Sequence, residues 1–138
     1  MTAAILAVFC LHWPAALPGQ IDRAARAAGS PSALLAATVG AESTCRADRK
    51  SRKGALGLGQ ILPGGSAAKH HTAKQLRRVR LNLRLAAEHL RKCLDTCGSW
   101  ASAVSMYAGA RGCVEGPWGM RVAGIAQRVL ASKGEPRS

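Results

Sequence analysis

The chain has 138 residues, and its 20 lysines and arginines against seven acidic residues give a formal net charge of +13 at neutral pH. Hydrophobic residues make up 48% of the chain, which argues against intrinsic disorder, and the length argues against two full domains, a barrel enzyme or a dinucleotide-binding fold. The charge indicates an anionic partner, such as nucleic acid, an acidic envelope or an acidic protein, without distinguishing among them.

The first sixteen residues open with an apolar run from Thr2 to Leu11, followed by the sequence HWPAA. This pattern resembles the hydrophobic region of a secretory signal, although only the amino terminus supplies the positive charge expected before it. It fits a first core helix equally well. Both interpretations of residues 1–16 stay open, and we expect a folded domain over residues 17–132 and a polar tail over residues 133–138.

Helical patterns dominate the body of the chain. An alanine- and arginine-rich stretch over residues 21–28 predicts a helix that ends at Gly29. Ser30 and Pro31 then predict the N-cap and the first position of a second helix, over residues 32–42.

A glycine-rich loop interrupts the helices over residues 45–63. Its second half reads GALGLGQI, which predicts a loop or a short hairpin, and no Gly-Lys-Ser/Thr follows that would make it a phosphate-binding loop. Its first half carries five basic residues: Arg46, Arg49, Lys50, Arg52 and Lys53.

Three helices are expected after the loop. Over residues 72–94, apolar side chains recur at steps of three and four with arginines largely between them, which predicts one long helix that Gly98 closes. Ser99 can cap a helix over residues 100–107, and Pro117 opens the last helix. The expected fold class is therefore mainly α, with one glycine-rich loop in the middle.

The chain has five cysteines: Cys10, Cys45, Cys93, Cys97 and Cys113. The last four are an even number within the body of the chain and allow three pairings. Disulfides among them would imply an oxidising compartment, whereas free thiols would act as small core residues. Because no pair of C-x-x-C motifs is present, the sequence predicts no zinc site. The four histidines, including His70-His71 and His89, are interpreted as solvated.

Glu42 is the first candidate catalytic residue. A carboxylate at the end of a helix faces the negative end of the helix dipole, and partial burial would raise its pKa further. A carboxyl group that stays protonated near neutral pH is what a general acid requires. The position of Glu42 alone fits a solvated glutamate better. The loop beyond it, however, contains glycines that permit close approach of the backbone to a ligand, and Gln60 adds an amide group beside them.

Four motifs resemble, in order, those of the lysozyme-like lytic transglycosylases that cleave bacterial peptidoglycan. The resemblance spans about residues 21–114 of the chain. The matches are Glu42-Ser43 after the helix LLAA for the Glu-Ser signature, Ser51 to Gln60 for the S-x-x-G-A-x-G-L-x-Q block, Asn82-Leu83 with Glu88-His89-Leu90 for the Asn-Ile…Tyr-Leu helix, and Tyr107-Ala108-Gly109 for the Tyr-Asn-Ala-Gly segment.

The resemblance implies a small helical domain of the goose-type or SLT kind, with the loop beside an active-site groove. Glu42 would be the single general acid and then the base, with neither a metal nor an organic cofactor. It would protonate the oxygen between MurNAc and GlcNAc and then accept the proton of the C6 hydroxyl, which closes a 1,6-anhydro ring. The implied substrate-binding residues are Ser51, Gly57, Leu58, Gln60 and Tyr107, and the supporting ones are Ser43 and Asn82.

Two positions depart from the family pattern. Ala108 replaces the usual asparagine, so one hydrogen bond is lost, and Gly59 stands where a bulky residue is common. The missing side chain at Gly59 would open the groove or loosen the loop.

Other functions remain open. A muramidase that uses water would need a second carboxylate, for which Asp48 is the candidate, although a solvated loop aspartate is the more ordinary interpretation. A nucleic-acid-binding module would use the basic residues of 69–92, and a non-catalytic glycan-binding component would share the fold. Neither of these two explains the Glu-Ser and loop motifs.

The expected partner is therefore the glycan strand of peptidoglycan, with the basic surface attaching a monomer to the anionic envelope and no specific binding of nucleic acid. The expected location is extracytoplasmic, in the periplasm or cell wall, reached by secretion or phage delivery.

Overall fold

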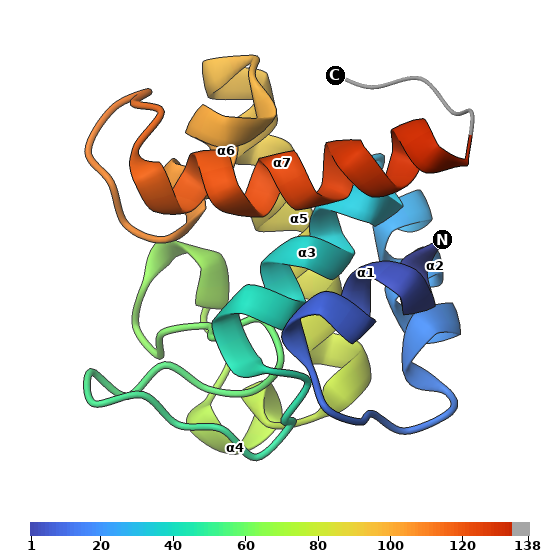
Figure 1. Cartoon of the computed structure of the whole chain (residues 1–138). Helices are drawn as coiled ribbons and strands as arrows, with labels where there is room; N and C mark the ends of the chain where they lie inside the picture. The colour runs from blue at the N-terminus through green and yellow to red at the C-terminus, as the bar shows by residue number, and fades with distance from the viewer. Residues whose placement is uncertain (134–138) are drawn as a thin grey trace.

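The computed structural model describes residues 1–133, so the predicted tail lies, apart from Lys133, outside the described residues. Within this range no β-strand forms, and the mainly α fold class is confirmed (Figure 1). No helix here is long and apolar enough to cross a membrane. The elements are α1 (Thr2–Phe9), α2 (Leu17–Ala28), α3 (Ser32–Ser43), η1 (Ser66–Ala68), α4 (Ala73–Leu76), α5 (Val79–Cys97), α6 (Trp100–Tyr107) and α7 (Pro117–Ser132).

Helix α3 is the centre of the molecule. It contacts α1, α2, α5 and α7, and residues 33–40 are all buried. A helix that is apolar on all sides is expected to be enclosed in this way. In Figure 1, α1 lies in front of α3, α5 lies behind it, and α7 runs across one end.

The N-terminal segment forms part of this core. Ile5 and Leu6 of α1 are fully buried. A Cβ at Gly40 would lie 2.8 Å from Phe9, so only glycine lets α1 approach α3 this closely. Helix α1 therefore packs against the core of the domain.

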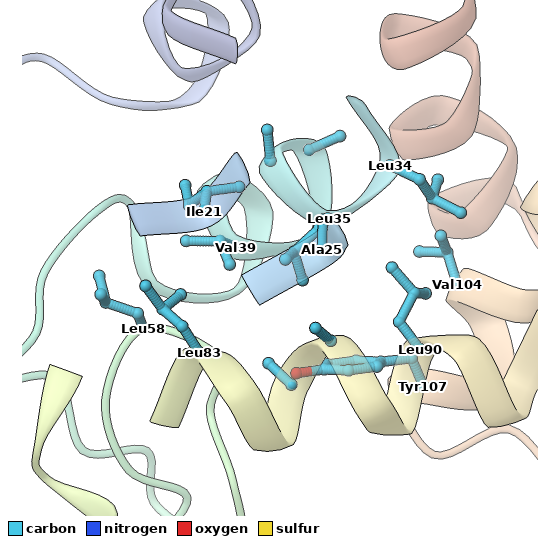
Figure 2. Close-up of a cluster of buried hydrophobic side chains, with 14 of the residues drawn as sticks. Ile21, Ala25, Leu34, Leu35, Val39, Leu58, Leu83, Leu90, Val104 and Tyr107 are labelled. Carbon is cyan, nitrogen blue, oxygen red and sulfur yellow. The ribbon is translucent and has the colours of Figure 1, made fainter. Parts of the chain in front are cut away.

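Figure 2 shows core side chains of α2, α3, α5 and α6 together with Leu58 of the loop. Ile21 of α2 lies beside Val39 of α3, and Leu90 of α5 lies near Val104 of α6. These side chains are buried, and at roughly 25 cal/mol per Å² of apolar surface their burial is the main source of stability.

Local signals placed most helix ends correctly. Gly29 and Gly98 follow α2 and α5 with positive φ angles of 73° and 84°, as predicted. The side chain of Ser99 accepts a hydrogen bond from the backbone of Ser102 at the start of α6, and Pro117 opens α7.

Two predictions about helix ends are wrong. Pro31, not Ser30, is the N-cap of α3, and the hydroxyl of Ser30 is buried without a hydrogen-bond partner. The single long helix over 72–94 is broken at Arg78, whose extended backbone precedes α5. The break exposes the carbonyl of Leu76, which accepts a hydrogen bond of 2.8 Å from the Asn82 side chain.

The cysteine pairing also differs from the prediction. Disulfides join Cys10 to Cys45 and Cys97 to Cys113, while Cys93 is free and buried. The three pairings left open all lay among the last four cysteines, whereas in the structure Cys10 is paired and Cys93 is not. Cys10 pairs with Cys45 because α1 ends beside the end of α3, a proximity that the sequence does not display.

Candidate active site

Glu42 lies half-buried in the last turn of α3. Within the described part of the chain its carboxyl group makes no hydrogen bond or ion pair, so no direct partner compensates its desolvation. Burial raises its pKa from 4.5 to about 7, and the nearby positive charge of Arg49 lowers it only in part. The Ser43 hydroxyl donates to the carbonyl of Val39 at 2.9 Å, which supports the helix end that carries Glu42.

Asn82 holds the glycine-rich loop against α5. Its side chain is buried, accepts from the backbone N–H of Gly59 at 2.7 Å and donates to the carbonyl of Leu56 at 2.9 Å. Gly57 adopts a φ of 76°, and a Cβ there would lie 2.6 Å from the Asn82 amide nitrogen. Glycine at this position is therefore required both by the backbone conformation and by the close approach of Asn82.

Gly59 is enclosed from two sides, contrary to the expectation that it opens the groove or loosens the loop. A Cβ on it would lie 2.6 Å from Cβ of Ala86 and 2.9 Å from the Tyr107 hydroxyl. Its carbonyl accepts a hydrogen bond of 2.7 Å from that hydroxyl. The absent side chain leaves no gap, because α5 and α6 fill the space and fix the loop backbone.

Gln60 and Ser51 are bound to the loop itself. Gln60 has a left-handed φ of 52°, which is uncommon for a residue other than glycine, and its amide nitrogen donates to the carbonyls of Gly57 and Arg49 at 2.9 and 3.2 Å. The Ser51 hydroxyl accepts from the backbone of Ala55 at 3.0 Å and closes a tight turn. Antiparallel bridges connect Leu56 with Lys50 and Ile61, and they are the remnant of the expected hairpin.

A cavity of about 160 Å³ lies between this loop, η1 and α5–α6. Among the predicted site residues, the structure brings Gln60 and Tyr107 together in its wall. Leu58 and Gly57 are buried instead, and Figure 2 shows Leu58 beside Leu83 in the core. Contact of these two residues with substrate stays a prediction.

Tyr107 connects the loop, the cavity and Glu42. It is 8% exposed, and its pKa is raised well above 10, mainly by burial and secondarily by the charges of Glu42 and Cys93. Its hydroxyl donates to Gly59, so in this structure it fixes the loop and does not hydrogen-bond Glu42.

His89 is the site residue that sequence reasoning missed. It is half-buried in the cavity wall, not solvated, and its ring centroid lies 5.0 Å from that of Tyr107. Burial lowers its pKa, with Lys92 adding to the effect, so the imidazole is neutral near pH 7. The sequence signal that could have identified it is its position: in the Asn-Ile…Tyr-Leu helix of the family pattern, His89 stands where the tyrosine is usual.

Asp48, the candidate second carboxylate, lies in solvent. Its side chain is 82% exposed and lies 3.7 Å from the guanidinium of Arg46. Its environment is that of an ordinary loop aspartate, in contrast to that of Glu42. In residues 1–133 no three His, Cys, Asp or Glu side chains form a group that could hold a metal ion.

Comparisons with known proteins agree with this geometry. The fold is similar to the structure of an inactive mutant of the lytic transglycosylase Slt from Pseudomonas aeruginosa, with a TM-score of 0.72 and 20% sequence identity. The similarity covers 90% of this chain and 25% of the other, so the chain spans about a quarter of that enzyme's length. A comparison with curated protein sequences found no match. Residues 19–121 match the family described as the transglycosylase SLT domain. This match covers more than half of the chain, so the chain belongs to the transglycosylase SLT domain family.

Proposed function

We propose that the chain is a peptidoglycan lytic transglycosylase domain in which Glu42 is the only catalytic carboxyl group. The observation that carries this proposal is the half-buried, unpaired Glu42 with a pKa of about 7, next to the loop and Tyr107. Family membership supports the substrate class. The similar Pseudomonas enzyme adds support, because its inactive form carries a single replacement of glutamate by glutamine.

The proposed reaction needs one group that first donates and then accepts a proton. Neutral Glu42 donates its proton to the oxygen that joins MurNAc to GlcNAc, and the bond from that oxygen to C1 of MurNAc breaks. The resulting carboxylate accepts the proton of the MurNAc C6 hydroxyl, and the oxygen of that hydroxyl bonds to C1 at the same time. The products are a GlcNAc end and a 1,6-anhydro-MurNAc end, and Glu42 returns to its neutral form.

A pKa near 7 suits both halves of this cycle, since the group is protonated often enough to donate and basic enough to accept. Water is not the nucleophile, so no second carboxylate is needed to position it. The exposure of Asp48 is in keeping with this mechanism. Gln60, His89 and Tyr107 offer polar and aromatic surface to the sugar from the cavity wall.

Zymography on purified peptidoglycan tests the catalytic assignment. We expect the wild type and Asp48→Asn to clear the gel equally and Glu42→Gln to give no clearing. Asp48 is the matched control, because it removes one carboxylate from the same region without touching the buried site. Equal clearing by Glu42→Gln would refute the role of Glu42.

Mass spectrometry of the released fragments tests the chemistry. Anhydro-muropeptides are expected. Fragments with reducing-end MurNAc would instead identify a hydrolase, and loss of activity in Asp48→Asn would then assign the second carboxylate.

We also propose that the domain acts outside the cytoplasm as a monomer held to the anionic envelope by its basic surface. Two disulfides and the peptidoglycan substrate of the family support this location.

A further inference from the structure

A second cavity, distinct from the one lined by Gln60 and Tyr107, lies between α2 and α5 and has a volume of about 430 Å³. Three arginines reach it from the two helices, Arg23 from α2 and Arg80 and Arg84 from successive turns of α5. The remaining lining residues are Gln20, Ala24, Ala27, Leu81 and Leu83.

The cavity contains no negative charge to balance these arginines. None of its lining residues is acidic. Within residues 1–133, Arg23, Arg80 and Arg84 make no ion pair, since the described pairs involve Arg46, Lys69 and Arg91 only.

Arg91, further along α5, is an arginine of this fold whose guanidinium has hydrogen-bond partners. Its guanidinium donates to Asp95 at 2.9 Å and to the carbonyl of Gly29 at 2.7 Å, and so ties α5 to the end of α2. The three cavity arginines have no comparable structural task. Arg23, Arg80 and Arg84 are exposed, and like charges that converge without a counter-ion repel one another, so a bound anion would stabilise this arrangement.

The chemistry of the lining narrows the class of anion. A guanidinium presents a planar fork of N–H donors that matches the oxygens of phosphate, and the Gln20 amide adds a neutral donor. Three positive charges are matched better by a dianion with three terminal oxygens than by a carboxylate or a phosphodiester, which carry one charge. The alanine and leucine side chains leave room for a small apolar or sugar group but offer it no further polar contact.

We propose that the cleft between α2 and α5 is a binding site for a phosphate dianion, either free phosphate or a phosphomonoester. The site is independent of the proposed glycan cleavage, because none of its lining residues belongs to the loop, α3 or α6. Its function would be to recognise a phosphorylated component where the domain acts.

Isothermal titration calorimetry at pH 8 and low salt tests the proposal with three probes: inorganic phosphate, methyl phosphate and dimethyl phosphate. Near this pH the first two are mainly dianions and the third is a monoanion. We expect saturable binding of both dianions at one site and binding of dimethyl phosphate at least about tenfold weaker, since a lost charge-assisted interaction costs that much or more. Equal binding of dimethyl phosphate would overturn the proposal in favour of a diester, such as a phospholipid headgroup or a nucleic-acid backbone.

Variants separate this site from the general positive charge. We expect Arg84→Gln to weaken methyl phosphate binding by about tenfold or more, and the triple variant Arg23→Gln/Arg80→Gln/Arg84→Gln to abolish it. The control Arg26→Gln/Arg111→Gln/Arg128→Gln removes the same charge from positions that are equally exposed but lie outside the cavity, and it should change binding less than about twofold.

Equal weakening by both triple variants, or absence of saturable binding in the wild type, would refute a built site. Circular dichroism spectra and melting temperatures close to those of the wild type should show that both triple variants fold. Because phosphate binding is measured directly, its outcome does not depend on whether the proposed glycan cleavage is correct.

Discussion

At the scale of single residues, the protonation of Glu42 controls the proposed reaction. The first step needs the neutral carboxyl group, and its pKa is about 7 because it is half-buried and unpaired. We therefore expect the initial rate of peptidoglycan solubilisation to fall as the pH rises through about 7, with a tenfold loss per pH unit well above that value. A rate that stays constant from pH 6 to pH 9 would contradict this.

Arg49 provides the matched test of that pH dependence, because its positive charge lowers the pKa of Glu42. Replacement by glutamine removes the charge, so the decline in rate should move to higher pH in Arg49→Gln. Arg52→Gln, a change of the same kind at an exposed position in the same loop, should leave the midpoint where it is.

The same pKa makes a prediction about stability. A carboxyl group with a pKa raised from 4.5 to about 7 is protonated in both the folded and unfolded states below pH 4.5, and ionised in both above pH 7. Folding then carries a cost that grows between these values and reaches up to about 3 kcal/mol. Glu42→Gln removes this cost, so it should raise the melting temperature more at pH 8 than at pH 4.5. An equal effect at both pH values would show that Glu42 is not desolvated as the fold indicates.

At the scale of elements, Gly59 is the point where the loop, α5 and α6 meet. Gly59→Ala would bring two Cβ atoms to 2.6 Å at Ala86 and crowd the Tyr107 hydroxyl, and such overpacking costs about 1–3 kcal/mol. We expect lower thermal stability and lower activity together. Adding Ala86→Gly should recover part of the stability, whereas Ala87→Gly, at the neighbouring buried alanine, should not. Equal stability of Gly59→Ala and the wild type would mean that the loop can move away without penalty.

The two disulfides offer a comparison between elements. The Cys10–Cys45 bond closes a separation of 35 residues and ends three positions after Glu42, whereas Cys97–Cys113 closes 16 residues. By chain entropy the first contributes about 3–4 kcal/mol and the second about 3 kcal/mol. We expect Cys10→Ala/Cys45→Ala to lower the melting temperature at least as much as Cys97→Ala/Cys113→Ala. It should lower activity more, because it frees α1 from the end of α3 that carries Glu42. The reverse order would show that α1 does not support the site.

At the scale of the whole molecule, features set by neighbouring residues could be predicted from the sequence, whereas features set by contacts between distant segments could not. The helix ends at Gly29, Gly98 and Pro117 follow from local backbone chemistry, and the motif order identified the family. The break before α5 and the burial of His89 depend on contacts with distant segments. These contacts arise only when the loop folds onto α5, through Asn82 and Tyr107.

The pairing of Cys10 had the same origin. Its partner is set by where α1 ends on α3, and a single sequence does not show which helices are neighbours. The composition was equally ambiguous about the partner, since a net charge of +13 is compatible with binding to nucleic acid as well as to an anionic envelope.

The fold gives that charge a location, which makes its role testable. Lys50 and Lys53 of the loop and Arg77 after α4 line one cavity of about 210 Å³, on the side of the molecule that carries the loop. At 0.1 M salt the screening length is about 10 Å, so only charges close to a bound wall polymer attract it. We expect Lys50→Gln/Lys53→Gln/Arg77→Gln to weaken binding to purified sacculi at 50 mM salt more than Arg26→Gln/Arg111→Gln/Arg128→Gln does. The difference should vanish at 1 M salt, where the screening length is about 3 Å. If the Lys50→Gln/Lys53→Gln/Arg77→Gln variant binds sacculi at low salt as well as the wild type does, these charges do not attach the domain to the wall. If both variants lose binding equally, attachment depends on net charge alone.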